Sequence, residues 1–81
     1  MDKETILKEL NSIFKDVLDN DTIVLKPETT AGDIEEWDSL SHIQLVVATE
    51  KKFKVRFTAS EIQNWKNAGE MCESVYNKIS K

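Results

Sequence analysis

The chain has 81 residues, of which 15 are acidic and 11 basic, so its formal net charge is −4 at pH 7. This length predicts one small domain that includes residues 1–81. The acidic balance argues against binding to a nucleic-acid backbone, no apolar run approaches the roughly 18 residues of a membrane span, and the amino terminus has no apolar signal core. One cysteine and one histidine leave no internal disulfide and no zinc cluster. We therefore expect a cytoplasmic monomer that does not bind nucleic acid and has no membrane span.

An amphipathic helix is expected after Asp2, whose side chain is suited to cap it. The turn-forming residues 19–21 (Asp-Asn-Asp) should end this helix. Residues 20–37 then lose the helical period and contain Pro27, so we expect a long loop that apolar anchors pin to the core. A strand at residues 22–25 is not expected, because no partner strand is visible. The apolar stripe of the first helix comprises Ile6, Leu7, Leu10, Ile13, Phe14, Val17 and Leu18.

A second helix is expected from Asp38-Ser39 to about Phe53, with either of the first two residues as its cap. Its apolar residues form two faces rather than one. Leu45, Val46, Thr49 and Phe53 share the first face, and Leu40, Ile43 and Val47 share the second. A chain of this length has little material to cover both faces, so the second face is a candidate surface for a partner. Burial beneath the long loop is the competing explanation.

The carboxyl-terminal part of the chain is expected to hold two more helices. Lys54–Phe57 alternates weakly and predicts an extended connector. Thr58 or Ser60 is suited to cap a short helix, and Asn67 to cap a final one. The apolar face of the final helix comprises Ala68, Met71, Cys72, Val75, Tyr76 and Ile79. The sequence thus predicts an all-α protein, a four-helix bundle with a long loop between helices 1 and 2 and a short third helix.

The segment Asp38-Ser39-Leu40 is the one to which we assign chemistry. A serine in the first turn of a helix is most often a cap, but this one follows a long loop and opens the helix with the second apolar face. Its hydroxyl is expected to project outward, beside backbone N–H groups that lack helical partners and at the positive end of the helix dipole. Such a position favours a phosphate ester, whose oxygens accept hydrogen bonds from those donors.

Residues 38–53, DSLSHIQLVVATEKKF, strongly resemble helix II of the acyl carrier proteins, which opens with Asp-Ser-Leu and continues with a similar apolar pattern that ends in Phe. The total length, the long loop before the motif and the short third helix agree as well. The resemblance implies a carrier, not an enzyme, that holds acyl or aminoacyl groups as thioesters on a 4′-phosphopantetheine arm. It also implies three kinds of partner: a phosphopantetheinyl transferase, a loading ligase or transferase, and downstream synthases.

The resemblance further assigns roles to residues. Ser39 is the attachment point of the arm, and Asp38 helps the transferase to hold its metal and coenzyme A. Leu40 and His42 are expected beside the arm, with His42 three residues after Ser39 and within reach of the phosphate. A solvent-facing histidine without a role is an equally common outcome. The positions that match partner-binding residues of the family are Leu40, Ile43 and Val47.

Trp37 is grouped with the partner-binding residues, where it would shield the base of the arm, and its competing role is to pin the loop to the bundle. Cys72 lies on the apolar face of the final helix, which predicts a buried, inert thiol. An apolar crevice would spare a thioester from hydrolysis by excluding water. The residues expected to line such a crevice are Leu45, Val46, Phe53 and the inner face of the first helix.

Three departures from the fatty-acid carriers bear on the pathway. Glu36-Trp37 stand where those carriers commonly have Gly-Ala, and Thr49 replaces a usual aliphatic residue. The second helix has few acids and carries Lys51 and Lys52, whereas fatty-acid carriers have an acid-rich helix II. Because complementary charge selects partners, we expect a dedicated carrier for a specialised pathway rather than for general fatty-acid synthesis.

Two other functions compete with a carrier. Asp38, Ser39 and His42 supply the residue types of a hydrolytic triad, but they fall within five consecutive positions and cannot reach the geometry that a triad needs. We therefore reject a hydrolase. A small helical interaction module, or a degenerate carrier, would use the face of Leu40, Ile43 and Val47 without any prosthetic group.

Overall fold

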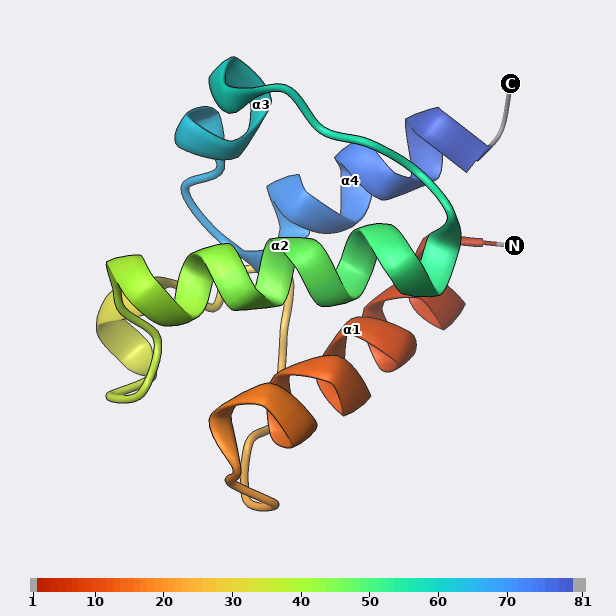
Figure 1. Ribbon diagram of the computed structural model, residues 1–81. Helices are drawn as coiled ribbons and strands as arrows, with labels where there is room; N and C mark the ends of the chain where they lie inside the picture. Colours follow the sequence, from red (N-terminus) through yellow and green to blue (C-terminus); the bar gives the residue numbers. More distant parts are fainter. Residues whose placement is uncertain (1, 80–81) are drawn as a thin grey trace.

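The computed structural model describes residues 2–79 and has an all-helical fold. Two long helices, α1 (Lys3–Leu18) and α2 (Ser39–Phe53), are followed by a short α3 (Ala59–Asn64) and by α4 (Ala68–Ile79). The connection from α1 to α2 contains one turn of 3-10 helix, η1 (Ala31–Asp33). Within residues 2–79 there is no strand. The predicted four-helix bundle with a long first loop and a short third helix is thus confirmed (Figure 1).

The helix ends lie where short polar side chains favour them. The Asp2 carboxylate accepts a hydrogen bond from the Thr5 backbone N–H at 2.8 Å and caps α1. Asp19 ends this helix in the left-handed conformation, at φ 52°, and Lys54 ends α2 in the same way, at φ 57°. Thr58, rather than Ser60, caps α3. These ends are local features, which is why the sequence indicated most of them.

The core lies between α1 and its two neighbours, because α1 contacts both α2 and α4. Thr49 is the polar member of this core, and its hydroxyl donates to the Leu45 carbonyl oxygen at 2.7 Å, so no polar group is left unpaired there. The other large side chains without solvent exposure are apolar, as the helical stripes predicted. They are Ile6, Leu10, Phe14, Leu45, Met71 and Val75.

The long loop is fixed to α1 and α4 through its backbone. The Asn11 side chain donates to the Ile23 carbonyl oxygen at 3.3 Å and accepts from the Leu25 N–H. The Ala68 N–H donates to the Thr29 carbonyl oxygen at 2.8 Å, so the loop also meets the first turn of α4. Because buried backbone groups need partners, these bonds let an irregular segment lie against the bundle and deliver the chain to the start of α2.

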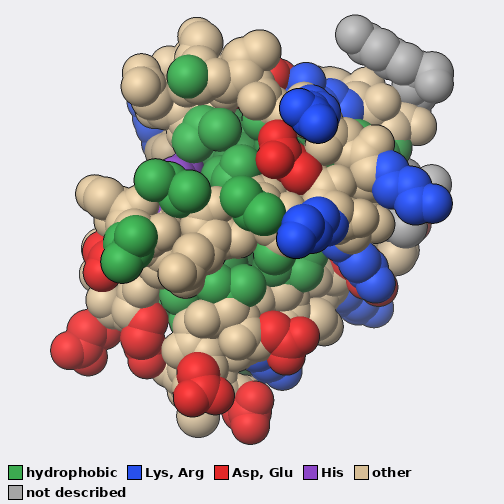
Figure 2. Space-filling model, in the orientation of Figure 1, with side chains coloured by type: hydrophobic (Ala, Val, Ile, Leu, Met, Phe, Trp, Pro, Cys, Tyr) green, Lys and Arg blue, Asp and Glu red, His purple; other side chains and the backbone are tan. Residues whose placement is uncertain are grey.

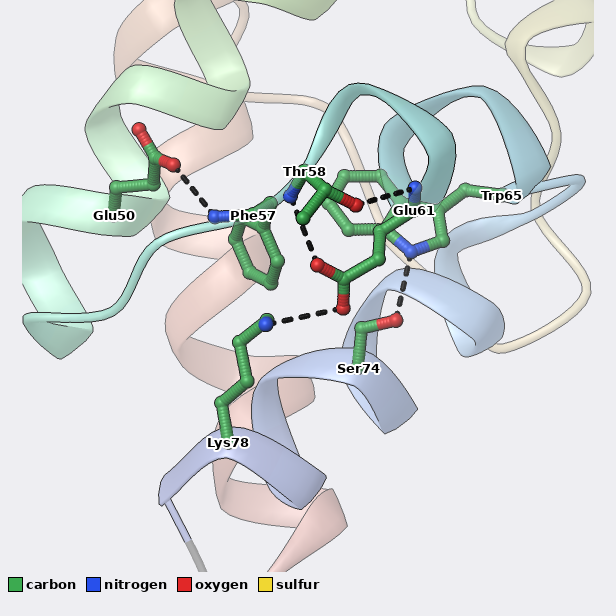
Figure 3. A network of polar contacts seen from close by, with 7 residues as sticks. All are labelled: Glu50, Phe57, Thr58, Glu61, Trp65, Ser74 and Lys78. Carbon is green, nitrogen blue, oxygen red and sulfur yellow. Dashed lines mark hydrogen bonds and ion pairs between the residues drawn. The ribbon is translucent and has the colours of Figure 1, made fainter.

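Side-chain hydrogen bonds hold α3 against the rest of the bundle (Figure 3). Thr58 and Glu61 form a reciprocal capping box at the start of α3. Lys78 of α4 forms an ion pair with Glu61 at 3.1 Å, and the Trp65 indole N–H donates to the Ser74 hydroxyl of α4 at 2.8 Å. These contacts tie both ends of α3 to α4 and so place Trp65 beside the first turns of α2. No helix of the described part is long and apolar enough to span a membrane.

Candidate functional site

Ser39 is the first residue of α2, and its side chain is exposed. Asp38 precedes it as the N-cap, so the alternative in which Ser39 itself caps the helix is wrong. The backbone N–H groups of the first turn of a helix have no intrahelical acceptor and point out of its amino-terminal end. The positive end of the α2 dipole therefore lies at Ser39, where the Asp38 carboxylate caps it. The structure therefore has the arrangement expected from the sequence, an accessible hydroxyl group at the start of a helix.

Asp38 and Ser41 form a reciprocal capping box that fixes this start. The Ser41 N–H donates to Asp38 Oδ1 at 2.9 Å, and the Asp38 N–H donates to Ser41 Oγ at 2.8 Å. The Ser41 hydroxyl in turn donates to the Glu36 carbonyl oxygen at 2.8 Å. The hydrogen bond from the Ser41 backbone lowers the pKa of Asp38, so its exposed carboxyl group stays ionised at neutral pH.

Ser41 is a residue of this site to which the sequence analysis gave no role. It is buried, and its hydroxyl links the last turn of the long loop to the first turn of α2. The spacing Asp-x-x-Ser is a variant of the capping box, in which a polar residue at the third helical position returns a bond to the cap. That spacing is the signal that would have found it.

Trp37 lies in the core rather than on a partner surface, which corrects one of our expectations. Only 7% of Trp37 is exposed, and its ring packs edge-on against Phe14 of α1 with centroids 4.8 Å apart. Its indole N–H donates to Nδ1 of His42 at 3.1 Å. An indole buries a large apolar area, and it can do so when its single N–H donor has a partner. Trp37 is therefore held by packing, and its side chain fixes the end of the long loop to the bundle.

His42 is half-buried and lies between two tryptophans. Its ring stacks on Trp37 at 6.0 Å with an interplanar angle of 25°, and it meets Trp65 edge-on at 5.9 Å. The hydrogen bond from Trp37 occupies Nδ1 as an acceptor, which assigns the ring proton to Nε2. His42 is therefore a fixed part of the site and not a free solvent-facing side chain.

Three apolar side chains form an exposed ridge along α2, which we call the α2 ridge: Leu40, Ile43 and Val47. Their exposed fractions are 70%, 61% and 43%. Burial beneath the long loop, the competing explanation, is therefore wrong. Figure 2 shows hydrophobic side chains gathered on the face along which α2 runs. The other predicted face of the helix points inward as expected, with Leu45, Val46 and Thr49 buried.

A hollow of about 710 Å³ opens beside Ser39, which we call the Ser39 hollow. It lies between the first turns of α2 and the segment of α3 and Trp65. Its lining residues are Ala31, Trp37, Asp38, Ser39, His42, Ile43, Ile62, Gln63, Trp65 and Lys66. The crevice expected from the sequence had a different lining, and the structure corrects it: Leu45 is fully buried and Val46 is 5% exposed, because both pack into the core.

The remaining candidate group, Cys72, is a buried thiol as expected. Its Sγ donates to the Lys3 carbonyl oxygen at 3.2 Å. Burial raises the pKa of Cys72, so the reactive thiolate is disfavoured at neutral pH. Among residues 2–79, no group of three or more His, Cys, Asp or Glu side chains is arranged to hold a metal ion.

Comparison with known proteins relates this geometry to one family. Residues 8–75 match the family described as phosphopantetheine attachment site. An acyl carrier protein of Acidothermus cellulolyticus is 36% identical over 77 residues, which cover 95% of this chain and 92% of the relative. An acyl carrier protein of Thermosynechococcus vestitus is 26% identical over 80 residues, or 99% of each chain.

A solved structure agrees with the sequence comparisons. The solution NMR structure of a holo acyl carrier protein from Geobacter metallireducens superposes with a TM-score of 0.88 at 44% sequence identity. The superposition covers 93% of this chain and 86% of the other. Fold and sequence therefore define one class, that of small helical proteins with a phosphopantetheine attachment site.

The chain belongs to the acyl carrier protein family. Its prosthetic group is 4′-phosphopantetheine, and its role is that of a carrier rather than a catalyst. Carriers of this family interact with a phosphopantetheinyl transferase and with enzymes that handle acyl groups. The family, the fold and the cofactor that the sequence predicted are confirmed.

Proposed function

We propose that Ser39 carries the 4′-phosphopantetheine arm and that residues 1–81 act as one carrier domain. The main support is the exposure of Ser39 as the first residue of α2. Its Oγ attacks the β-phosphorus of coenzyme A, the bond to 3′,5′-ADP breaks, and the hydroxyl proton passes to a base of the transferase. The first turn of α2 then offers the positive end of its dipole to the ester oxygens.

Asp38 is proposed to help the transferase bind its metal ion and coenzyme A. Its carboxylate is exposed and ionised next to the reacting hydroxyl. The cap uses Oδ1, which accepts the Ser41 N–H, and this leaves the lone pairs of Oδ2 for a hard cation that prefers oxygen ligands. A single side chain thus sets the start of α2 and presents a negative charge beside Ser39.

The α2 ridge is proposed as the docking surface for partner enzymes. It begins one residue after Ser39 and continues, at the same helical spacing, to Lys51. Lys52 is occupied by an ion pair with Glu9 at 3.0 Å, and Glu50 accepts a hydrogen bond from the Phe57 N–H at 2.9 Å. The ridge therefore presents apolar side chains and a basic end.

The charge pattern of α2 supports a specialised pathway. Residues 39–56 carry one acid and four basic side chains. A partner with basic docking residues would meet like charge there, whereas an acidic docking surface would be attracted. We propose that the cognate partners have acidic residues near the carboxyl end of α2, and that the chain serves a dedicated biosynthetic pathway rather than general fatty-acid synthesis.

Intact mass spectrometry tests the attachment site. We expect coexpression with a broad-specificity phosphopantetheinyl transferase to add the mass of one phosphopantetheinyl group to the wild-type chain. Ser39→Ala should abolish this addition. Ser60→Ala is the matched control, since Ser60 is also an exposed serine in the first turn of a helix, and it should be modified like the wild type. Modification of the Ser39→Ala variant would refute the assignment.

A result without any modification would support the competing function. A wild-type chain that several such transferases leave unmodified would be a degenerate carrier or an interaction module that acts through the α2 ridge. Circular dichroism of the same samples would show whether each variant is folded, so that loss of the hydroxyl is separated from loss of the bundle.

A further inference from the structure

The Ser39 hollow has the size of a small-molecule site. Its volume of about 710 Å³ falls within the range of roughly 300–1,000 Å³ that is usual for ligand pockets. Half of its lining residues are aromatic or aliphatic, and the other half are polar or titratable. Ser39 itself lines the hollow, so whatever is tethered to Ser39 starts at its edge.

Three rings form one side of this hollow and close the bundle behind it. The His42 ring lies between Trp37 and Trp65, stacked on the first and edge-on to the second. Behind them, Trp37 packs edge-on against Phe14, which is fully buried. Phe57 meets Trp65 edge-on at 4.9 Å and extends the aromatic group toward α3. Because these rings are packed against one another, they block access to the core. A group tethered to Ser39 would therefore contact the outer side of the rings.

The polar groups of the hollow include donors and acceptors, because the Asp38 carboxylate and the Gln63 amide oxygen accept while other lining groups donate. Because His42 Nδ1 accepts from Trp37 at 3.1 Å, its Nε2 carries the proton and is a donor. The exposed Lys66 adds an ammonium group, and Gln63 an amide. Ile43 and Ile62 supply aliphatic walls. A planar aromatic group matches the rings of this hollow, since aromatic rings prefer stacked or edge-to-face partners.

We propose that the Ser39 hollow binds an aromatic acyl group carried on the arm, and that His42 and the two tryptophans select it over long alkyl chains. This inference rests on the proposed attachment to Ser39. The tether raises the effective concentration of the cargo at the hollow, so weak stacking suffices to hold it. A long alkyl chain finds rings and polar groups here, and the core behind them is filled by Phe14 and Leu45.

The first test uses the two indole N–H groups as reporters in ¹⁵N–¹H spectra. The transferase loads the chain from benzoyl-, octanoyl- and hexadecanoyl-coenzyme A, and intact mass verifies each product. We expect the benzoyl form to shift the Trp37 and Trp65 indole signals relative to the holo form, and both alkyl forms to leave them in place. Unchanged indole signals in the benzoyl form would overturn the proposal, as would alkyl forms that shift the backbone amide signal of the buried Leu45.

The second test measures thioester hydrolysis. Binding of the aryl group should slow hydrolysis of the benzoyl form relative to benzoyl-pantetheine by about fivefold to tenfold, the effect expected of one stacking contact. Ile62→Ala removes one wall of the hollow and should lose most of this protection, whereas Val24→Ala, at an exposed valine outside the hollow, should keep it. Equal rates in both variants would contradict the site.

The two proposals fail in different ways. If mass spectrometry finds no arm on Ser39, the attachment site is wrong, and the binding of a tethered cargo in the hollow is wrong with it. If the arm is present but the benzoyl form neither shifts the indole signals nor resists hydrolysis, the attachment site stands and the binding of an aromatic cargo in the hollow is refuted.

Discussion

Gly69 lies in the first turn of α4, directly against the long loop. Its N–H donates to the Pro27 carbonyl oxygen at 2.8 Å, and a Cβ added at this position would lie 2.8 Å from the same oxygen. It would also lie 3.2 Å from Pro27 Cα. Glycine is therefore required here by a close approach of two backbones, not by a left-handed conformation.

A glycine pair tests this approach. Gly69→Ala should lower the free energy of unfolding by about 1–3 kcal/mol, because loop backbone has to move, and thermal denaturation measures it. Gly32→Ala is the control: its Cβ would lie 3.6 Å from the nearest atom, at Thr30, so the variant should be neutral or more stable by a few tenths, up to about 1 kcal/mol. Equal melting temperatures for the two variants would contradict the close approach.

Residues also differ in how far the sequence alone could predict them. Ser39 at a helix start could be predicted, because capping and apolar periodicity act within a few residues. The sequence left two positions open for Trp37, and its contacts with Phe14 of α1 and with His42 decided for the buried one. The contact between Gly69 and Pro27 could not be predicted from the sequence, since a contact between residues far apart in the chain leaves no local pattern.

At the scale of the element, α2 combines two surfaces on one helix. Its inner face completes the core with Leu45, Val46 and Thr49, and its outer face is the α2 ridge. Two apolar faces on one helix were visible in the sequence, and the structure decided that the second one is exposed. The reason is the path of the long loop, which packs against α1 and α4 and leaves the outer face of α2 uncovered.

A matched pair of valines tests docking on the α2 ridge. Val47→Glu should lower kcat/KM of a phosphopantetheinyl transferase for the apo chain by about tenfold, because a charge replaces an apolar contact near the reacting serine. Val24→Glu introduces the same charge at a valine that is 71% exposed in the long loop and should leave kcat/KM unchanged. Equal losses in both variants would indicate a general charge effect and refute docking on the ridge.

At the scale of the whole molecule, three of the four described helices have a titratable carboxylate at or near their amino-terminal end that accepts a backbone hydrogen bond. Asp2, Asp38 and Glu61 accept hydrogen bonds from the backbone of Thr5, Ser41 and Thr58, and these bonds lower the pKa of each carboxyl group below its ordinary value, 3.8 for the aspartates and 4.5 for the glutamate. A lowered pKa in the folded state means that the charged form contributes stability. That contribution is complete above the ordinary values and is lost as the pH falls through the lowered ones.

The melting temperature should therefore fall on acidification from about pH 5 to about pH 3, as the helix starts lose their charged acceptors together. Scanning calorimetry across this range measures the fall. Asp2→Asn keeps a good capping group without a titrating charge, so its melting temperature should fall less steeply than that of the wild type. A wild-type melting temperature that stays constant down to about pH 3 would contradict a structural role for these carboxylates.

The amino-acid sequence by itself determined the four helices, most of their ends, the inner face of α2 and the serine that opens it. Each of these depends on interactions within one or two helical turns, so each leaves a pattern in the order of residues. Only the tertiary structure decided that Trp37 is buried, that His42 is held between two tryptophans, and that the hollow opens beside Ser39. These features bring together residues 14, 37, 42 and 65 from four separate segments, and a contact of that kind is fixed by the packing of the bundle rather than by any local preference.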